Sequence, residues 1–411
     1  QVIYDERSPK YVDHLNKTFY FLEDGRCFIV REETSTGYMH LYLYGIGQGV
    51  LHPITQGEWE VTDFVGLRGD KVYYISTESS PLKRDLYRVG LDGKHKERLT
   101  PGDGYYSIYP SADLSYYICE GGDSSAPGRT DVFNAAGKRV RTLYDNAPLK
   151  EALVEAGLPV REFFTFTTER GDELNGYMLK PLDFDPAKRY PVLLTQYSGP
   201  GSQQVAEGWG PDWEDALVTH GYIVVCVDPR GTGYRGEEFK KLTYGNLGRL
   251  EVEDQISTAR YMARQSYVDP ARIGIYGWSY GGFMALGCAF RGEGLFKMAI
   301  AVAPVTSWRY YDSIYTENFN GLPDDYPKGY DDNSPVNLAH LFRDDSTRLL
   351  IVHGTADDNV HFQNTMEMAR ALNKLGKQYD MMVYPDQNHS MMPDDMIHVR
   401  EKMLRYTLEN L

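Results

Sequence analysis

The chain has 411 residues, enough for two domains of ordinary size, and 42% of its residues are apolar. Its net charge of −15, without any basic patch, argues against a nucleic-acid binder. No apolar run reaches the roughly 18 residues of a membrane-spanning helix, and no pair among the four cysteines has the spacing of metal ligands.

The first 155 residues predict an all-β domain built from a repeat. Residues 41–45 (Leu-Tyr-Leu-Tyr-Gly) match residues 86–90 (Leu-Tyr-Arg-Val-Gly), and the turn at 54–57 matches the turn at 99–102, both at an offset of 45 residues. A looser third copy begins at Asp131. Short strands and tight turns at this spacing are typical of β-propeller blades.

About three blades fit into residues 1–155. Propellers typically close with about four to eight blades, and an open piece would expose sheet edges and apolar faces. We therefore expect a partial propeller, completed by a propeller segment of the same protein that precedes this chain. The adjacent Glu32 and Glu33, in a strand-to-turn stretch, are expected at the surface.

Residues 156–411 predict a doubly wound, mostly parallel α/β sheet, because strand and helix patterns alternate. An antiparallel pair is expected first, at 163–167 and 174–179. Further strands are expected near 191–197, 222–228, 272–276, 297–303, 348–353 and 379–384, and helices near 248–265, 282–291, 362–375 and 394–409. Residues 153–160 are the expected hinge between the two domains.

Residues 277–281 read Gly-Trp-Ser-Tyr-Gly, between a strand pattern and a helix pattern. This is the context of a nucleophile elbow, in which glycines permit a tight turn that holds a serine hydroxyl out of the sheet. The alternative is a glycine-rich turn that merely closes a strand. We predict that Ser279 is a nucleophile, and a serine nucleophile needs a general base and a carboxylate that orients it.

The chain after Ser279 supplies both partners in the order serine, acid, histidine. A buried strand at 348–353 leads into a loop with Asp357, and the strand at 379–384 leads into a loop with His389. Sites on parallel sheets form at the carboxyl ends of strands. The adjacent Asp358 is the alternative acid. The other nearby histidines fit a packed strand end, a helix start or a solvated helix face better than a base: His353, His361 and His398.

An oxyanion hole is the remaining requirement of acyl transfer. One donor is expected from the backbone N–H of Tyr280, the residue after the nucleophile. The phenol of Tyr197, at the end of the strand at 191–197, is a candidate second donor. An ordinary strand-end tyrosine is the alternative for that residue.

These motifs resemble the prolyl oligopeptidase family of serine peptidases, in particular its dipeptidyl peptidase IV branch. The resemblance lies in residues 277–282, 310–317 and 353–362 and in the spacing of Ser279, Asp357 and His389. It implies a partial β-propeller at 1–155 followed by an α/β-hydrolase domain at 156–411. It also implies that these three residues form a catalytic triad and that Tyr197 and Tyr280 supply the oxyanion hole.

The resemblance further implies a small aromatic pocket that accepts a proline ring or an alanine methyl group. Its lining would be Trp278, Tyr280, Val305, Trp308, Tyr311, Tyr315 and Val360, with Asn359 on the carbonyl of the penultimate residue. The implied activity is release of X-Pro or X-Ala dipeptides without a cofactor or metal. A homodimer that uses the last strand and the helix near 394–411, and a secreted or periplasmic location, are also implied.

One departure from the branch concerns the substrate amine. In relatives a pair of glutamates on a propeller helix, assisted by an arginine, binds that amine, and residues 1–155 offer no counterpart. A tripeptidyl or acyl-aminoacyl peptidase with the same triad is therefore an alternative. A non-catalytic binding member of the branch and a carboxylesterase are further alternatives, disfavoured by the intact triad and by the aromatic pocket respectively.

Overall fold

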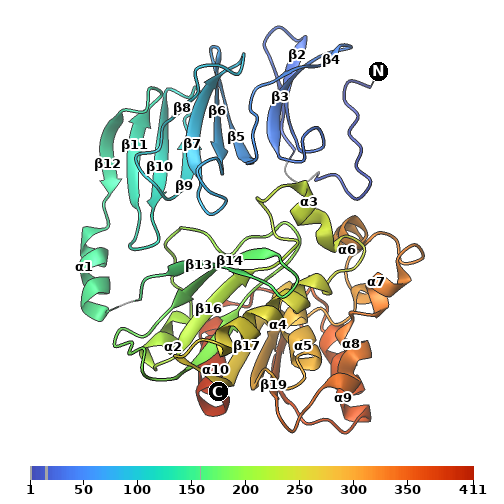
Figure 1. Cartoon of the computed structure of the whole chain (residues 1–411). Coiled ribbons are helices and arrows are strands. Elements are labelled where there is room, and N and C mark those ends of the chain that lie inside the picture. Colours follow the sequence, from blue (N-terminus) through green and yellow to red (C-terminus); the bar gives the residue numbers. More distant parts are fainter. Residues whose placement is uncertain (1, 14–16, 158) are drawn as a thin grey trace. The chain divides into compact units, whose positions relative to one another are not determined.

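The computed structural model describes residues 2–13, 17–157 and 159–411 (Figure 1). The chain divides into two compact units. The first comprises Gln1–Val160, Ala206–Gly210 and Gly233–Lys241, and the second comprises Arg161–Val205, Pro211–Thr232 and Leu242–Leu411. Among the helices of the described residues, none is both long and apolar enough to cross a bilayer.

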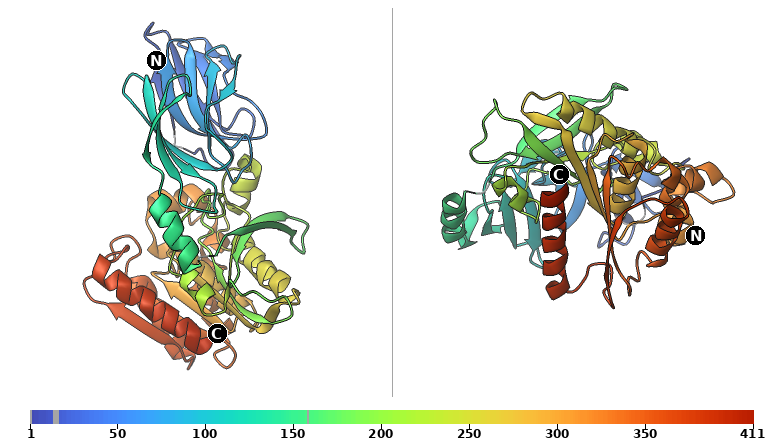
Figure 2. Two further views of the ribbon diagram at one scale, coloured as in Figure 1. Left: turned by 90° about the vertical axis from the view of Figure 1, so that its left-hand side faces the viewer. Right: turned by 90° about the horizontal axis from the view of Figure 1, so that it is seen from below.

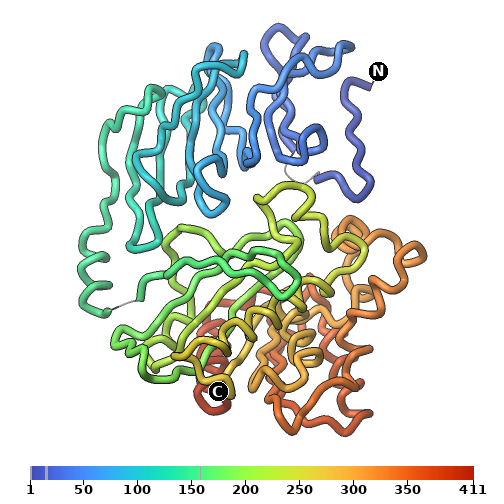
Figure 3. The backbone as a smooth tube through the Cα atoms, in the orientation of Figure 1, coloured from blue at the N-terminus to red at the C-terminus, as the bar shows by residue number. Residues whose placement is uncertain are grey.

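The first unit contains three antiparallel four-stranded sheets, which follow one another along the chain (Figure 3). We name them blades I, II and III. Blade I consists of β1 (Phe19–Phe21), β2 (Cys27–Glu32), β3 (His40–Gly45) and β4 (Gly49–Pro53). Blade II consists of β5 (Val61–Arg68), β6 (Lys71–Ser76), β7 (Asp85–Gly90) and β8 (Glu97–Arg98). Blade III consists of β9 (Tyr105–Pro110), β10 (Tyr116–Gly122), β11 (Arg129–Asn134) and β12 (Arg139–Tyr144).

The sequence repeat is the third strand of each blade. The matched residues 41–45 and 86–90 lie in β3 and β7, and the third copy at Asp131 lies in β11. Apolar side chains between the blades form two cores, one that joins Ile29 and Leu41 to Val72 and one that joins Leu86 to Phe133. The predicted propeller-type fold of this region is confirmed.

The prediction that Glu32 and Glu33 lie at the surface is wrong. Their exposed fractions are 2% and 1%. Glu33 forms ion pairs with Lys240 and Lys241, the second at 2.7 Å, and Glu32 accepts hydrogen bonds from hydroxyl groups of the same unit. Because the lysines lie more than 200 residues away in the sequence, no local pattern could have indicated them.

The second unit is built on one eight-stranded sheet of order β13-β14-β16-β15-β17-β18-β19-β20. The first two strands form the predicted antiparallel pair, and β15 to β20 pair in parallel. Their bounds are β13 (Glu162–Thr167), β14 (Glu173–Leu179), β15 (Tyr190–Thr195), β16 (Ile223–Asp228), β17 (Val268–Trp278), β18 (Met298–Val302), β19 (Arg348–Gly354) and β20 (Asp380–Tyr384). This confirms the predicted mostly parallel sheet.

Helices cover both faces of this sheet, with α10 on the opposite face from α4 and α5 (Figure 2). The four predicted helices are α4 (Leu250–Ala263), α5 (Tyr280–Arg291), α9 (Gln363–Lys374) and α10 (Pro393–Asn410). The sequence analysis missed α1 (Ala147–Ala156), α2 (Asp215–Thr219), α3 (Glu237–Lys240), α6 (Ser313–Asn320), α7 (Pro327–Asp331) and α8 (Pro335–Leu338). Most of these span only one or two turns, too short for a periodic apolar pattern. Helix α1 occupies the start of the expected hinge at 153–160, in which Leu158 lies outside the described residues.

A buried ion pair anchors α4 beside the sheet. The guanidinium of Arg230, two residues after β16, contacts the Asp254 carboxylate of α4 at 2.6 Å and 3.0 Å. The exposed fractions are 6% for Arg230 and 0% for Asp254. A buried charge without its partner is strongly destabilising, because water no longer solvates it.

Arg230 also pairs with Asp172 at 3.2 Å and with Glu253 at 3.7 Å, so Asp254→Asn leaves its charge partly paired. We predict that this variant lowers the free energy of unfolding by about 1.5–3 kcal/mol, the contribution of a hydrogen bond to a charged group. The matched control is Asp331→Asn, because Asp331 forms an equally close two-pronged pair with Arg309 but both side chains are 43% exposed. That variant should lose less than about 1 kcal/mol. Urea denaturation measures both, and equal losses would contradict the role given to burial.

Candidate active site

Ser279 stands on a sharp turn between β17 and α5. Its backbone has φ 62° and ψ −116°, a left-handed φ that a residue with a side chain rarely adopts. Hydrogen bonds hold this conformation, since Ser279 N–H donates to the Val302 carbonyl at 2.8 Å and its carbonyl accepts from Phe283 N–H at 3.0 Å. The side chain is half-buried at the carboxyl end of β17.

The glycines around Ser279 are required by close backbone packing. A Cβ at Gly277 would lie 2.2 Å from the carbonyl oxygen of Gly281, and one at Gly281 would lie 2.5 Å from that of Gln196. Both distances are far below van der Waals contact. Glycine is thus required at both positions, and the turn has the geometry of a nucleophile elbow.

Asp357 and His389 meet beyond the ends of two neighbouring strands. Asp357 follows β19, His389 follows β20, and His389 Nδ1 lies 2.7 Å from Asp357 Oδ2. Backbone hydrogen bonds tie the two loops together, from Thr355 N–H to the Tyr384 carbonyl and from Ala356 N–H to the Gln387 carbonyl. Asp357 is buried, whereas the alternative acid Asp358 is exposed.

Four N–H groups surround the Asp357 carboxylate. The backbone N–H groups of Asn359 and Val360 donate to Oδ1 at 3.0 Å and 2.9 Å. On the other oxygen, His353 Nε2 lies 3.1 Å from Oδ2, beside His389. Burial alone would raise the pKa of Asp357, but the hydrogen bonds from His353, His389 and Asn359 hold that pKa well below its ordinary value. The carboxylate is therefore ionised at any working pH.

The serine and the histidine line one pocket of about 520 Å³. Of the predicted site residues, its lining contains Tyr197, Trp278, Ser279, Tyr311, Asn359 and His389. The Trp278 indole N–H donates to the His389 carbonyl at 3.1 Å, which fixes the histidine loop to the elbow. A serine on an elbow that shares a pocket with a histidine–carboxylate pair is the arrangement that carries out nucleophilic acyl transfer.

Tyr197 directs its ring toward the elbow. It follows β15, and its ring centroid lies 6.0 Å from that of Tyr280. Burial raises the pKa of the Tyr197 phenol, which keeps the hydroxyl protonated and able to donate a hydrogen bond.

Four of the predicted pocket residues form a continuous group of aromatic rings. Trp308 lies 5.3 Å from Tyr280, 6.0 Å from Tyr311 and 6.1 Å from Tyr315 between ring centroids. The Tyr311 hydroxyl donates to Asn359 Oδ1 at 2.9 Å. Val305 and Val360 are buried, with exposed fractions of 2% and 0%. They do not line the pocket of about 520 Å³, and neither do Tyr280, Trp308, Tyr315 and Asp357.

Sequence reasoning missed three features of this site. His353 was expected only to pack, yet it contacts Asp357. Glu251 of α4 is fully buried and accepts a hydrogen bond of 2.7 Å from the Tyr280 hydroxyl. The lining of the pocket also includes residues that no motif indicated: Asp212, Trp213, Tyr276, Met396, Arg400 and Met403. Only the spacing of four residues between His353 and Asp357 offered a signal.

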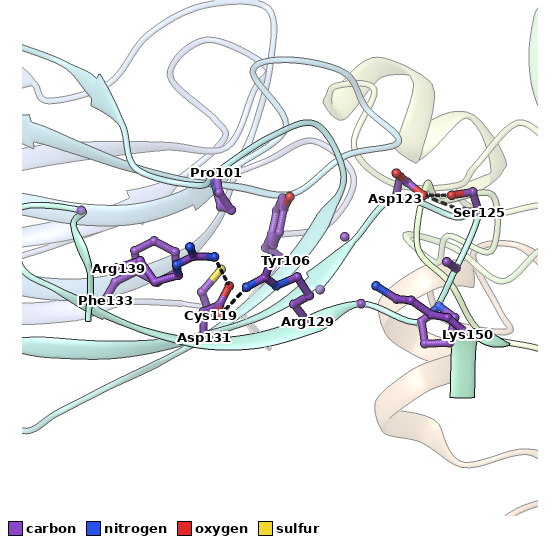
Figure 4. A pocket seen from close by; sticks show the side chains of 16 residues that line it. Pro101, Tyr106, Cys119, Asp123, Ser125, Arg129, Asp131, Phe133, Arg139 and Lys150 are labelled. Atoms are coloured by element: carbon purple, nitrogen blue, oxygen red, sulfur yellow. Dashed lines mark hydrogen bonds and ion pairs between the residues drawn. The ribbon is translucent and has the colours of Figure 1, made fainter. Parts of the chain in front are cut away.

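A second pocket, of about 660 Å³, lies in the first unit on blade III (Figure 4). Its central carboxylate, Asp131, lies 3.3 Å from Arg129 and 4.0 Å from Arg139, so both arginines neutralise its negative charge. Burial raises the pKa of the Cys119 thiol there to about 12, so that thiol is not ionised near neutral pH. The pocket offers no activated nucleophile among its described residues.

Glu251 makes stability depend on pH, and we predict that Glu251→Gln removes the part of this dependence that Glu251 contributes, while Glu214, whose pKa burial also raises to about 7, retains its own part. Burial raises the pKa of Glu251 to about 7, compared with about 4.3 for an unfolded glutamate. The raised pKa means that protonated Glu251 favours the folded state. Its contribution to the free energy of unfolding is therefore fully present below about pH 4.3 and is lost as pH rises through about 7. Between about pH 5 and 8 the wild type should lose about 3 kcal/mol more than the variant.

Urea denaturation at the two pH values measures this difference. Glu317→Gln, at an exposed position, is the control and should leave the pH dependence unchanged. An equal loss in the wild type and Glu251→Gln would contradict the assignment.

Comparison with known proteins places these features in one family. Residues 209–411 match the Prolyl oligopeptidase family, and residues 1–127 match the Dipeptidyl peptidase IV (DPP IV) N-terminal region. A probable dipeptidyl-aminopeptidase B of Aspergillus niger is 41% identical over 86% of this chain, and one of Pyrenophora teres f. teres is 40% identical over 87%. The chain spans 40% of the length of each of these relatives.

Solved structures agree with this placement. The crystal structure of Porphyromonas gingivalis dipeptidyl peptidase 4 superposes with a TM-score of 0.93 at 41% identity, over 98% of this chain and 57% of that one. A putative dipeptidyl aminopeptidase IV from Bacteroides ovatus gives a TM-score of 0.90 at 28% identity, over 98% of this chain and 60% of that one. The chain belongs to the prolyl oligopeptidase family, in its dipeptidyl peptidase IV branch.

Proposed function

We propose that this protein is a serine exopeptidase that releases X-Pro or X-Ala dipeptides from the free N-termini of peptides. The observation that carries the proposal is the 2.7 Å contact between His389 and Asp357 in loops beside the Ser279 elbow. The matched relatives are dipeptidyl-aminopeptidases by name, which supports the same reaction.

In the proposed mechanism His389 Nε2 takes the proton of Ser279 as its oxygen attacks the carbonyl carbon of the second residue. Asp357 accepts from His389 Nδ1–H and stabilises the imidazolium that forms. The Tyr280 backbone N–H and the Tyr197 hydroxyl would donate to the oxygen that becomes negative. His389 then gives this proton to the leaving amine. In the second half of the reaction, His389 takes a proton from water, which attacks the carbonyl carbon of the acyl-enzyme, and then returns a proton to Ser279 as the dipeptide leaves.

The aromatic group explains the proposed preference for small second residues. Tyr311 lines the pocket and can pack against a proline ring, and its ring is supported by those of Trp308 and Tyr315 behind it. A long or charged side chain would lack both the space and the polar partners that it needs. Asn359, held by Tyr311, would contact the carbonyl of the first residue.

Recognition of the free amine is proposed for a propeller segment of the same protein outside this chain. The adjacent glutamates Glu32 and Glu33 do not take this role, because both are buried. Glu33 is neutralised by Lys240 and Lys241, so it is not available to a substrate.

A homodimer formed through β20 and α10 is part of this proposal. Strand β20 lies at the edge of its sheet, where unpaired backbone groups favour association. Apolar side chains of both elements are exposed in this chain, with Met381 at 42% and Ile397 at 68%. We also propose a secreted or periplasmic location, on the basis of the family alone.

Three chromogenic substrates test the dipeptidyl rule: Gly-Pro-anilide, its N-acetylated form and an X-Y-Pro-anilide. We expect turnover of Gly-Pro-anilide alone, because only a free amine two residues before the cut bond would match the proposed site. Turnover of the acetylated or longer substrate would be consistent with the proposed triad but would contradict dipeptidyl specificity. It would indicate an acyl-aminoacyl or a tripeptidyl peptidase instead. A protein that cleaves none of the three would fit a non-catalytic binding member.

Adjacent carboxylates provide a sharp test of the triad. Asp357→Asn should lower kcat about 10⁴-fold, because the amide no longer holds His389 in the required tautomer. Asp358→Asn removes the exposed neighbouring charge and should change kcat by less than about twofold. Steady-state kinetics on Gly-Pro-anilide measures both variants, and the reverse ranking would assign the acid to Asp358.

A further inference from the structure

His353 is a second histidine on the proposed catalytic aspartate. It lies at the end of β19, four residues before Asp357, and its exposed fraction is 0%. Its Nε2 atom lies 3.1 Å from Asp357 Oδ2 and 2.8 Å from the Val360 carbonyl oxygen. Its Nδ1 atom lies 2.7 Å from the hydroxyl oxygen of Thr365 in α9.

These contacts fix the proton on the ring. Both partners of Nε2 are oxygens that only accept, so Nε2 must carry a hydrogen. The Thr365 hydroxyl can donate to Nδ1, so a neutral ring satisfies every contact. His353 therefore donates one N–H, shared between Asp357 and Val360.

We propose that His353 is a positioning residue, which holds Asp357 Oδ2 in place to receive the N–H of His389. This rests on the proposed function. The argument is that Oδ2 accepts from both histidines, while the N–H groups of Asn359 and Val360 hold Oδ1. His353 is the only side chain besides His389 that the described hydrogen bonds place on this carboxylate.

Packing alone does not explain an imidazole at this position. The ring meets Phe362 edge to face at 5.5 Å between centroids, a contact that an apolar side chain would also make. An apolar side chain would, however, leave the Val360 carbonyl without its N–H donor and Oδ2 with His389 alone. The polar contacts, rather than the volume, thus account for a histidine.

Loss of the His353 donor has two expected effects on catalysis. A less restrained carboxylate orients His389 less well, and a hydrogen bond to a charged group corresponds to roughly 10- to 100-fold in an equilibrium. Oδ2 would also become a stronger acceptor for His389 alone, which stabilises the protonated imidazole. We therefore expect a lower kcat, and an acid limb of the kcat/KM profile shifted to higher pH.

The test compares His353→Leu with His353→Gln in the intact protein. The leucine variant should lower kcat about 10- to 100-fold, with KM nearly unchanged because His353 does not line the pocket. It should also shift the acid limb upward. The glutamine side chain offers an amide N–H donor and should restore most of kcat and the wild-type acid limb. A folded leucine variant with wild-type kcat and pH profile overturns the proposal, as does a glutamine variant that is equally impaired.

His40→Leu is the matched control. His40 belongs to the first unit, is likewise 0% exposed, and contacts a threonine hydroxyl at 3.0 Å and a carbonyl oxygen at 2.9 Å. Its loss should lower the melting temperature without a shift of the pH profile. If His353→Leu does not fold, Thr365→Val replaces it in the test, because this variant removes the hydroxyl group that contacts Nδ1 on the other side of the His353 ring. That variant should shift the acid limb in the same direction, and an unchanged limb overturns the proposal.

Each variant is assayed on Gly-Pro-anilide and on p-nitrophenyl acetate, an activated ester that requires only the nucleophile and its base. A wild type that hydrolyses the ester but not the anilide contradicts the dipeptidyl function and leaves the His353 comparison intact on the ester. A wild type that hydrolyses neither overturns both proposals.

Discussion

The buried carboxylate of Asp357 is the interaction on which the site depends. A negative charge away from water is unfavourable unless donors surround it, and here four N–H groups do so from His353, Asn359, Val360 and His389. These donors come from β19, from the loop after it and from the loop after β20. The charge therefore organises the two loops and fixes His389, which lines the same pocket as Ser279.

The parallel sheet brings the other groups of the site to the same edge as that charge. Strands β15, β17, β18, β19 and β20 are neighbours in the sheet, and their carboxyl ends lead to Tyr197, Ser279, Trp308, Asp357 and His389 respectively. The elbow adds a local constraint, because its glycines allow backbones to approach where a Cβ would collide. Sheet order and backbone contact together bring Ser279 and His389 into one pocket.

The sequence predicted the features that depend on local pattern and missed those that depend on distant contacts. The Gly-Trp-Ser-Tyr-Gly turn, the strands that carry Asp357 and His389, and the repeated third strand of each blade all have a local signature. Glu33 was misplaced because Lys240 and Lys241 are remote in the sequence. Trp213, Met403 and the Glu251–Tyr280 hydrogen bond belong to segments that meet only in the folded sheet.

The measurement that tests the account most directly is labelling of the protein with a serine-directed phosphonate, followed by mass spectrometry of its peptides. The account predicts one adduct, on Ser279, which is lost in His389→Ala because the base is needed to activate the hydroxyl. Absence of an adduct in the folded wild-type protein, or an adduct that forms equally fast without His389, would contradict the proposal that these residues form a catalytic unit.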